Sequence, residues 1–249
     1  MKDKSNKGER LQVALARFGL ASRRGVVGLI EEGLVEVNGE VVREKGFRVD
    51  PERDQIRVQG NDLPSASPQK KVYYIFNKPK GVMTTLQDPH AIETVADYFQ
   101  DVSERLFPVG RLDRDTTGLL IMTNDGELAF RLTHPKFGVK KRYRARVSGA
   151  VTDEEVKYLE GGVNLEDGVT APCKIKIEKK DTRETTLHVV LHEGKKRQIR
   201  RIFQKIGHKV LTLERTDYGP LSLSGMRFGE KRALTRAEVS ALFKTAGLK

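Results

Sequence analysis

Residues 60–71, GNDLPSASPQKK, place the strongest constraint on how this chain can fold. The stretch is rich in Gly, Pro and Ser and has almost no large apolar side chain, which is typical of a linker. A chain of 249 residues has room for a small module and a larger domain. We therefore predict a module at 1–60, a linker at 61–71 and a domain at 72–249.

The pattern of residues 1–60 predicts a compact module of two helices and a small sheet. Leu and Val side chains recur at helical spacing, Gly19 stands where the first helix should end, and Ser22 can cap the second. The stretch LVEVNGEVV that follows alternates around Asn38-Gly39, which is a hairpin signal. DQIRVQG is expected to add one more short strand.

Beyond the linker, strand-like segments outnumber helical ones, and many are joined by short turns. The expected helices are GELAFRLTH, a segment opened by Thr152, a segment whose apolar stripe ends at Gly207, and TRAEVSALFKTAG. This pattern predicts an α+β fold in which a mixed, largely antiparallel sheet is flanked by helices. We find no repeat of fixed period and no Gly-rich phosphate loop.

The charge of the chain indicates a polyanionic partner. The formal net charge is +12, with 46 Lys and Arg against 34 Asp and Glu, and the pI is near 9.7. Two stretches concentrate this charge: Lys136 to Arg146 holds six basic residues and no acid, and Lys195 to Arg215 holds eight basic residues and one acid. Such clustering favours binding to nucleic acid.

Other compositional features limit the compartment and the chemistry. The longest apolar runs are far too short to span a membrane, and the charged N-terminus has no apolar signal segment. Cys173 is the only cysteine, so neither an intrachain disulfide nor a cysteine-based zinc cluster can form. We expect a cytoplasmic, soluble protein that holds no metal.

Asp113 and Asp115 lie in the polar loop of GRLDRDTTGLLIMTNDG, directly before an apolar strand. Asp and Thr are common in turns, so a purely structural role is the simplest interpretation. However, Arg111 and Arg114 alternate with the acids, and the strand would hold an exposed carboxylate rigidly. Neighbouring cations favour the ionised form, in which an aspartate can act as a nucleophile or a base.

Two other segments can supply partners for this loop. Tyr143 lies among cations in KKRYRARV, where its ring could be part of a core or could stack on a nucleobase. Arg200, in EGKKRQIRRIF, stands at the edge of a buried stripe, where a guanidinium can clamp a carboxylate. The rest of this basic segment reads either as a solvated face or as an RNA-binding surface.

These motifs, in this order, resemble those of RNA pseudouridine synthases, in the branch with the ribosomal small-subunit enzyme and the large-subunit enzymes B, E and F. The resemblance covers nearly the whole chain, through NKPKGVMTT, GRLDRDTTGLLIMTNDG, KKRYRARV, EGKKRQIRRIF and a final RALT. Residues 10–60 resemble the S4 RNA-binding domain, including its ASRR and VEVNG segments. The resemblance implies a pseudouridine synthase fold behind an S4-type module.

The resemblance also implies roles for particular residues. Asp113 falls on the essential aspartate, Tyr143 on the tyrosine that packs against the target uracil, and Arg200 on the basic residue that is salt-bridged to that aspartate. The expected RNA contacts are Arg17, Arg23, Arg24, Arg111, Lys195, Lys196, Arg197 and Arg201. The reaction that the resemblance implies, isomerisation of uridine to pseudouridine in RNA, needs no cofactor. We expect a monomer that acts on ribosomal RNA, more specifically on the large-subunit RNA.

Two departures and two alternatives accompany this interpretation. Many relatives have a different pair after the aspartate and Ser before the Gly, and Gly25 and Gly28 stand where relatives favour acidic or Ala-rich positions in the second helix. A non-catalytic S4-type protein of ribosome assembly would keep the fold for RNA binding alone. A metal-dependent nuclease would need several carboxylates around Mg²⁺, here Asp113 and Asp115 with Asp88 or Asp125.

Overall fold

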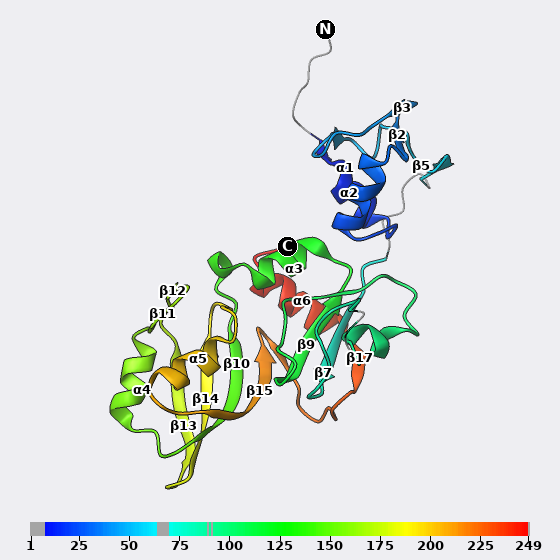
Figure 1. Cartoon of the computed structure of the whole chain (residues 1–249). Helices are drawn as coiled ribbons and strands as arrows, with labels where there is room; N and C mark the ends of the chain where they lie inside the picture. Colours follow the sequence, from blue (N-terminus) through cyan, green and yellow to red (C-terminus); the bar gives the residue numbers. More distant parts are fainter. Residues whose placement is uncertain (1–7, 64–69, 89, 91, 249) are drawn as a thin grey trace. The chain divides into compact units, whose positions relative to one another are not determined.

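The computed structural model describes residues 8–63, 70–88, 90 and 92–248, and it divides into two compact units, Met1–Lys71 and Val72–Lys249 (Figure 1). Each unit has its own apolar core. None of the helices in the described ranges is long and apolar enough to cross a membrane.

In the first unit, two helices pack on a small antiparallel sheet. The strand order is β3-β2-β5-β6, and a separate pair joins β1 to β4. The elements are β1 Glu9–Arg10, α1 Leu11–Arg17, α2 Arg23–Glu31, β2 Val35–Val37, β3 Glu40–Val41, β4 Arg48–Val49, β5 Ile56–Val58 and β6 Asn61–Asp62. Leu11, Leu15 and Ile30 are fully buried against the sheet, which agrees with the helical spacing of these apolar residues.

Local signals in this unit act as the sequence indicates. Ser22 accepts a hydrogen bond from the Gly25 amide at 3.0 Å and so caps α2. Asn38 and Gly39 both have positive φ, +54° and +82°, as a tight hairpin turn requires. The pairing of β6 with β5 extends this sheet into 61–71, the segment expected to be linker throughout. Residues 64–69 of that segment lie outside the described residues.

The second unit is built on a nine-stranded mixed sheet with the order β13-β14-β10-β15-β9-β7-β17, where β16 pairs with β15 and β8 with β9. All pairs are antiparallel except β9 with β15. The strands are β7 Tyr73–Lys78, β8 Phe107–Pro108, β9 Thr117–Thr123, β10 Lys141–Ser148, β13 Lys174–Lys180, β14 Glu184–Leu191, β15 Val210–Tyr218, β16 Leu221–Ser222 and β17 Lys231–Ala233. The predicted α+β fold with a mixed, largely antiparallel sheet is confirmed.

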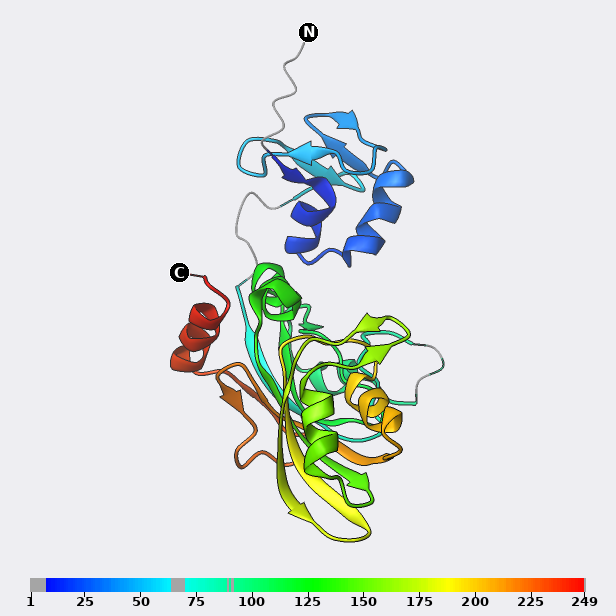
Figure 2. The same cartoon turned by 90° about the vertical axis from the view of Figure 1, so that its left-hand side faces the viewer.

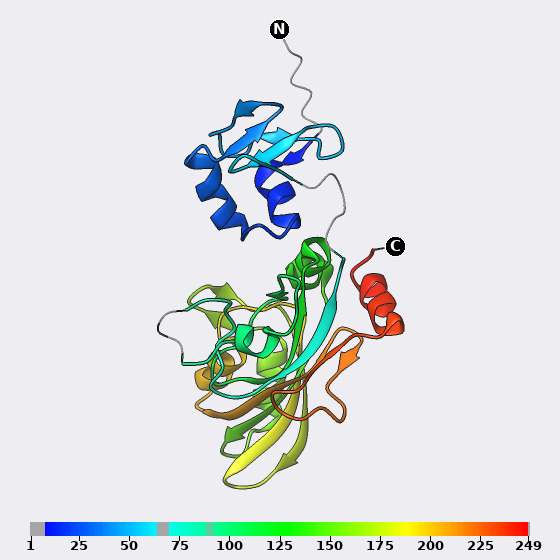
Figure 3. The same ribbon diagram turned by 90° about the vertical axis from the view of Figure 1, so that its right-hand side faces the viewer.

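Helices cover both faces of this sheet. On one face, α4 and α5 pack on β10, β13 and β14, and η1 packs on β7 and β9 (Figure 2). On the other face, α3 and α6 pack on β7 and β9 (Figure 3). The helical segments are η1 Val95–Phe99, α3 Gly126–Thr133, η2 Pro135–Phe137, α4 Asp153–Glu160, α5 Gln198–Lys205 and α6 Arg236–Thr245; a small hairpin joins β11 Asn164–Leu165 to β12 Gly168–Val169.

Gly118 makes the parallel contact between β9 and β15 possible. Its φ is +108°, and a Cβ atom at this position would lie 2.3 Å from the carbonyl oxygen of Arg215. Only glycine has the conformational freedom and the small size that this approach requires. Because Gly118 is the second residue of β9 and β9 begins where the polar loop 110–116 ends, the approach brings that loop to the centre of the sheet. There the half with β13, β14, β10 and β15 meets the half with β9, β7 and β17.

Candidate active site

The loop that carries the two aspartates is fastened to the turn that follows β7. Thr84 Oγ1 donates a hydrogen bond to the carbonyl oxygen of Leu112 at 2.8 Å. Gly81 N donates to the carbonyl of Arg114 at 2.8 Å, and Arg114 Nε donates back to the carbonyl of Gly81 at 3.1 Å. The motifs NKPKGVMTT and GRLDRD, which lie far apart in the sequence, therefore form one structural block.

A buried lysine stands behind this block. Lys78 is fully buried, and its Nζ donates to the carbonyl oxygens of Pro79 at 2.9 Å and Val82 at 2.8 Å. Burial lowers the pKa of Lys78 to about 8, although the charges of Asp115 and Asp113 act in the opposite direction. Lys78 thus holds the shape of the turn and adds positive charge behind the two carboxylates.

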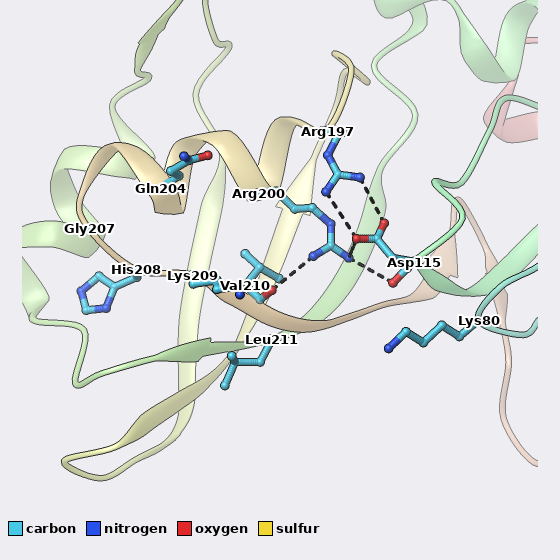
Figure 4. A pocket seen from close by; sticks show the side chains of 10 residues that line it. All are labelled: Lys80, Asp115, Arg197, Arg200, Gln204, Gly207, His208, Lys209, Val210 and Leu211. Atoms are coloured by element: carbon cyan, nitrogen blue, oxygen red, sulfur yellow. Dashed lines mark hydrogen bonds and ion pairs between the residues drawn. The ribbon is translucent and has the colours of Figure 1, made fainter.

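Asp115 is the centre of an ion-pair network with α5 (Figure 4). Arg197 is bidentate to its carboxylate, with Nη1–Oδ1 3.1 Å and Nη2–Oδ2 3.3 Å. Arg200 Nη2 lies 3.1 Å from Oδ2 and donates to the Asp115 carbonyl at 3.0 Å. Partial burial alone would raise the pKa of Asp115, but the bonds from Arg197 and the charge of Arg200 outweigh it, so this pKa lies below its ordinary value.

Asp113 projects from the same loop with a side chain that is 34% exposed. Its Oδ2 lies 3.8 Å from Arg197 Nη1. The ion pair implied between Asp113 and Arg200 is wrong for this structure: within the described part of the chain, Arg200 pairs with Asp115 instead. Burial lowers the pKa of Arg200, and the negative charges of Asp115 and Asp113 both oppose this effect. The charge of Asp113 therefore acts on Arg200 although the two side chains form no ion pair.

Arg197 reaches both carboxylates from an unusual backbone position. It is the N-cap of α5 and has φ +50° and ψ +33°, the left-handed conformation that side chains other than Gly, Asn and Asp seldom adopt. Backbone strain of this kind persists where the surrounding structure enforces it, often at functional sites. Here it aims the guanidinium at the loop rather than along the helix.

Two of the cations predicted to bind RNA are bonded to the β11–β12 hairpin. Arg201 is bidentate to Asp167, with both distances 2.9 Å. Lys195 Nζ donates to the carbonyls of Asp167 at 2.8 Å and Gly168 at 3.0 Å. Both residues therefore hold the β11–β12 hairpin against α5. By contrast, Lys196 is exposed.

Tyr143 lies at the centre of the sheet on β10, opposite Val189 of β14 and Arg215 of β15. Its half-buried ring packs against both apolar clusters on the face that carries α5 and η1. Its hydroxyl accepts a long hydrogen bond from Arg215 Nη1 at 3.5 Å, and Arg215 is itself anchored by a 2.7 Å bond to the carbonyl of Leu119. The tyrosine is thus held in place beside β15, the strand that pairs with the start of β9 next to the aspartate loop.

A pocket of about 590 Å³ opens beside the ion-pair network. It is lined by Lys80, Asp115, Arg197, Arg200, Gln204, Gly207, His208, Lys209, Val210 and Leu211. Neither Asp113 nor Tyr143 is part of its lining, so the pocket adjoins the predicted catalytic residues rather than containing them. Lys80 and Lys209 could not be predicted as neighbours from the sequence, because only the fold brings the turn after β7 and the α5–β15 connection to one place.

The remaining predicted residues lie in the first unit and in the aspartate loop. In the first unit, Arg17 pairs with Glu9 at 2.8 Å and Arg24 is exposed on α2; nothing is described of the Arg23 side chain. Arg111 is exposed in the aspartate loop. Over the ranges that the structure covers, no group of three His, Cys, Asp or Glu residues could hold a metal ion.

Comparison with known proteins identifies the family of this chain. The model of the RNA pseudouridylate synthase family matches residues 72–205, and that of the S4 domain matches residues 9–56. Ribosomal large subunit pseudouridine synthase B from Bacillus subtilis is 44% identical over 94% of this chain and 95% of its own length. An uncharacterized RNA pseudouridine synthase from Aquifex aeolicus is 43% identical over 96% of both chains.

A solved structure of a pseudouridylate synthase has the same fold. It matches with a TM-score of 0.68 and 28% identity over 94% of this chain and 99% of its own. The chain belongs to the RNA pseudouridylate synthase family, and in its sequence an S4 domain precedes the synthase domain. The resemblance inferred from the motifs is therefore confirmed, and this protein is a pseudouridine synthase.

Proposed function

We propose that this enzyme isomerises a specific uridine of large-subunit ribosomal RNA and that Asp113 is its essential carboxylate. The substrate class is supported by the relative from Bacillus subtilis, which is named for the ribosomal large subunit, and by the S4 domain match. One observation supports the residue above all others. Asp113 presents a partly exposed carboxylate 3.8 Å from Arg197, on a loop that is bonded to the turn after β7 and is joined to α5 by the ion pairs of Asp115.

The reaction rearranges bonds without changing the composition of the RNA. The N1–C1′ bond breaks, the uracil turns, a C5–C1′ bond forms, the C5 proton leaves and N1 gains a proton. Asp113 acts at the ribose, either as a nucleophile on C1′ or as a base, because an ionised carboxylate can serve in both roles. No redox partner, nucleotide or metal takes part in this scheme.

Tyr143 and Arg200 support the same step in different ways. The Tyr143 ring, held between the two halves of the sheet, offers a face on which the uracil packs. Arg200 acts through Asp115, because its guanidinium joins the loop to α5 and does not form an ion pair with Asp113. Arg197 is the nearer counter-ion of the essential carboxylate.

The target uridine must leave its helix to reach the site, which costs a few kcal/mol, roughly, unless the base is already unpaired. Phosphate contacts can supply that free energy and make binding fall steeply with salt. The proposed contacts are Arg111, Lys196 and Arg197 beside the site and Arg17, Arg23 and Arg24 on the S4 domain. Lys195 and Arg201 contribute by holding the β11–β12 hairpin. We also propose that the enzyme works as a cytoplasmic monomer.

Mapping of pseudouridines in ribosomal RNA tests the proposal. RNA from cells that lack the protein should lose one or a few pseudouridines, and the purified enzyme should restore them on an unmodified transcript. Asp113→Asn should restore none while it binds the same transcript as tightly as the wild type does. Turnover by this variant would disprove the role of Asp113, and an unchanged map would disprove the ribosomal substrate. Activity should persist in EDTA, whereas a metal-dependent nuclease would lose it.

A further inference from the structure

The pocket beside the ion-pair network has features that the isomerisation step does not use. Its volume is about 590 Å³. One wall is formed by Asp115, Arg197 and Arg200, where both guanidinium groups pair with the one carboxylate (Figure 4). The rest of the lining comes mainly from two segments. The turn after β7 supplies Lys80, and residues 207–211 lead from α5 into β15. The space is therefore continuous with the aspartate loop.

Two lysines make this pocket electropositive. Lys80 and Lys209 are both exposed, and neither forms an ion pair with any residue in the described part of the chain. His208 is turned to other partners, since its Nδ1 lies 2.5 Å from the carbonyl of Ser148 and its Nε2 lies 3.3 Å from Glu155. Among the residues that line the pocket, the positive charge without an ion-pair partner thus belongs to two lysines from separate segments.

The pocket also has an apolar wall and a neutral hydrogen-bonding group. Leu211 is 41% exposed although it is a large hydrophobic residue, and it lines the pocket together with Val210. Gln204 offers an amide from α5. Inorganic phosphate would need only the cations, whereas a nucleotide also has a sugar and a base to place on an apolar surface.

We propose that this pocket binds the nucleotide adjacent to the target uridine, with its phosphate between Lys80 and Lys209 and its sugar or base against Leu211. The inference rests on the proposed function. Arg197 determines the adjacency, because its guanidinium lines the pocket and lies 3.8 Å from Asp113 at the same time. The pocket is therefore adjacent to the place where the target uridine would lie.

Substitution of the two lysines tests the phosphate contact in the full-length enzyme. The substrate is the shortest fragment of the large-subunit transcript that the wild type still modifies. Lys80→Ala with Lys209→Ala should raise KM about ten-fold at low salt and reduce the slope of log affinity against log salt by about one per lysine, with the effect on KM rather than kcat. Lys244→Ala, which removes an exposed lysine from α6, is the matched control and should change neither quantity. An unchanged KM and salt slope would overturn the proposal.

A second pair of measurements separates the nucleotide from a bare anion. Leu211→Ser should raise KM without changing the salt slope, because it removes an apolar surface and no charge. A neutral methylphosphonate next to the target uridine should weaken binding by the wild type but not by the double lysine variant. If the neutral linkage weakens both proteins equally, the phosphate lies elsewhere. Asp113→Asn is assayed in parallel, so that loss of turnover there, with no lysine effect, refutes only the pocket.

Discussion

Arg200 donates to the backbone oxygen of Asp115 at 3.0 Å and lies 3.1 Å from its carboxylate, and it also donates to the carbonyl of Val210 at 3.2 Å. A single side chain, only 12% exposed, therefore joins the aspartate loop, helix α5 and strand β15. Its planar fork allows these bonds to form together, which a lysine ammonium could not reproduce with the same geometry. The position of Asp113 depends on these bonds of Arg200, although Arg200 forms no ion pair with Asp113.

Asp115→Asn should slow the chemical step while RNA binding is retained. The amide cannot pair with Arg197 and Arg200 as the carboxylate does, so the loop loses its fixed position relative to α5. A shift of about 1 Å at a reacting group can reduce the rate roughly a hundred-fold, and we expect kcat to fall by that order with little change in KM. Single-turnover assays measure the effect. Asp153→Asn, at an exposed aspartate on α4, is the matched control, and equal rates for all three proteins would contradict the prediction.

Gly118→Ala should destabilise the catalytic domain by about 3 kcal/mol, because the new Cβ would meet the backbone of Arg215 and the positive φ is unfavourable for alanine. Chemical denaturation followed by circular dichroism measures the loss. Gly194→Ala is the matched control in the same domain, since a Cβ there would have no neighbour within 4 Å. A midpoint for Gly118→Ala equal to that of the control would show that β9 and β15 can separate without cost.

Lys78 should make stability rise with pH above neutrality. Its pKa in the folded protein is about 8, against an ordinary value of 10.5, because of burial. Between these two pH values the unfolded chain keeps a proton that the folded chain has released, so the free energy of unfolding increases with pH. The slope from one such group is at most about 1.4 kcal/mol per pH unit. The free energy of unfolding of the wild type minus that of Lys78→Met, measured by urea unfolding, should increase with pH across this window. A difference that does not change with pH would refute the prediction.

Arg24 and its neighbour Arg23 should contribute to affinity but not to chemistry. Arg24 is exposed at the start of α2 in the S4 domain, where a phosphate can reach it. Replacing both arginines by alanine should weaken binding to the full, structured ribosomal RNA about ten-fold and lower the salt slope by about one for each phosphate that is no longer neutralised. Turnover of a short fragment should stay the same. Equal losses on both substrates would mean that the pair serves the fold.

Much of the architecture could be predicted because it depends on interactions between residues close in sequence. Ser22 caps α2, Asn38-Gly39 forms the hairpin turn, and the α5 stripe ends before Gly207, all from patterns within a few residues. The two-residue strand β6 was missed because Asn61 and Asp62 have little strand propensity, and only pairing with β5 holds them. The bonds of Lys195 and Arg201 to Asp167 could not be predicted, because Asp167 lies about thirty residues away from both in the sequence.

The sequence by itself determined the family, the order of the elements and the loop in which the carboxylates lie, because ordered motifs and local periodicity are properties of the chain. The tertiary structure decided which cation meets which acid. Arg197 and Arg200 differ by less than one helical turn, and either could reach Asp113 or Asp115 until the backbone angles of Arg197 and the register of β9 on β15 position their guanidinium groups. Ion pairs act over a few ångströms, so this choice depends on three-dimensional geometry that no local pattern specifies.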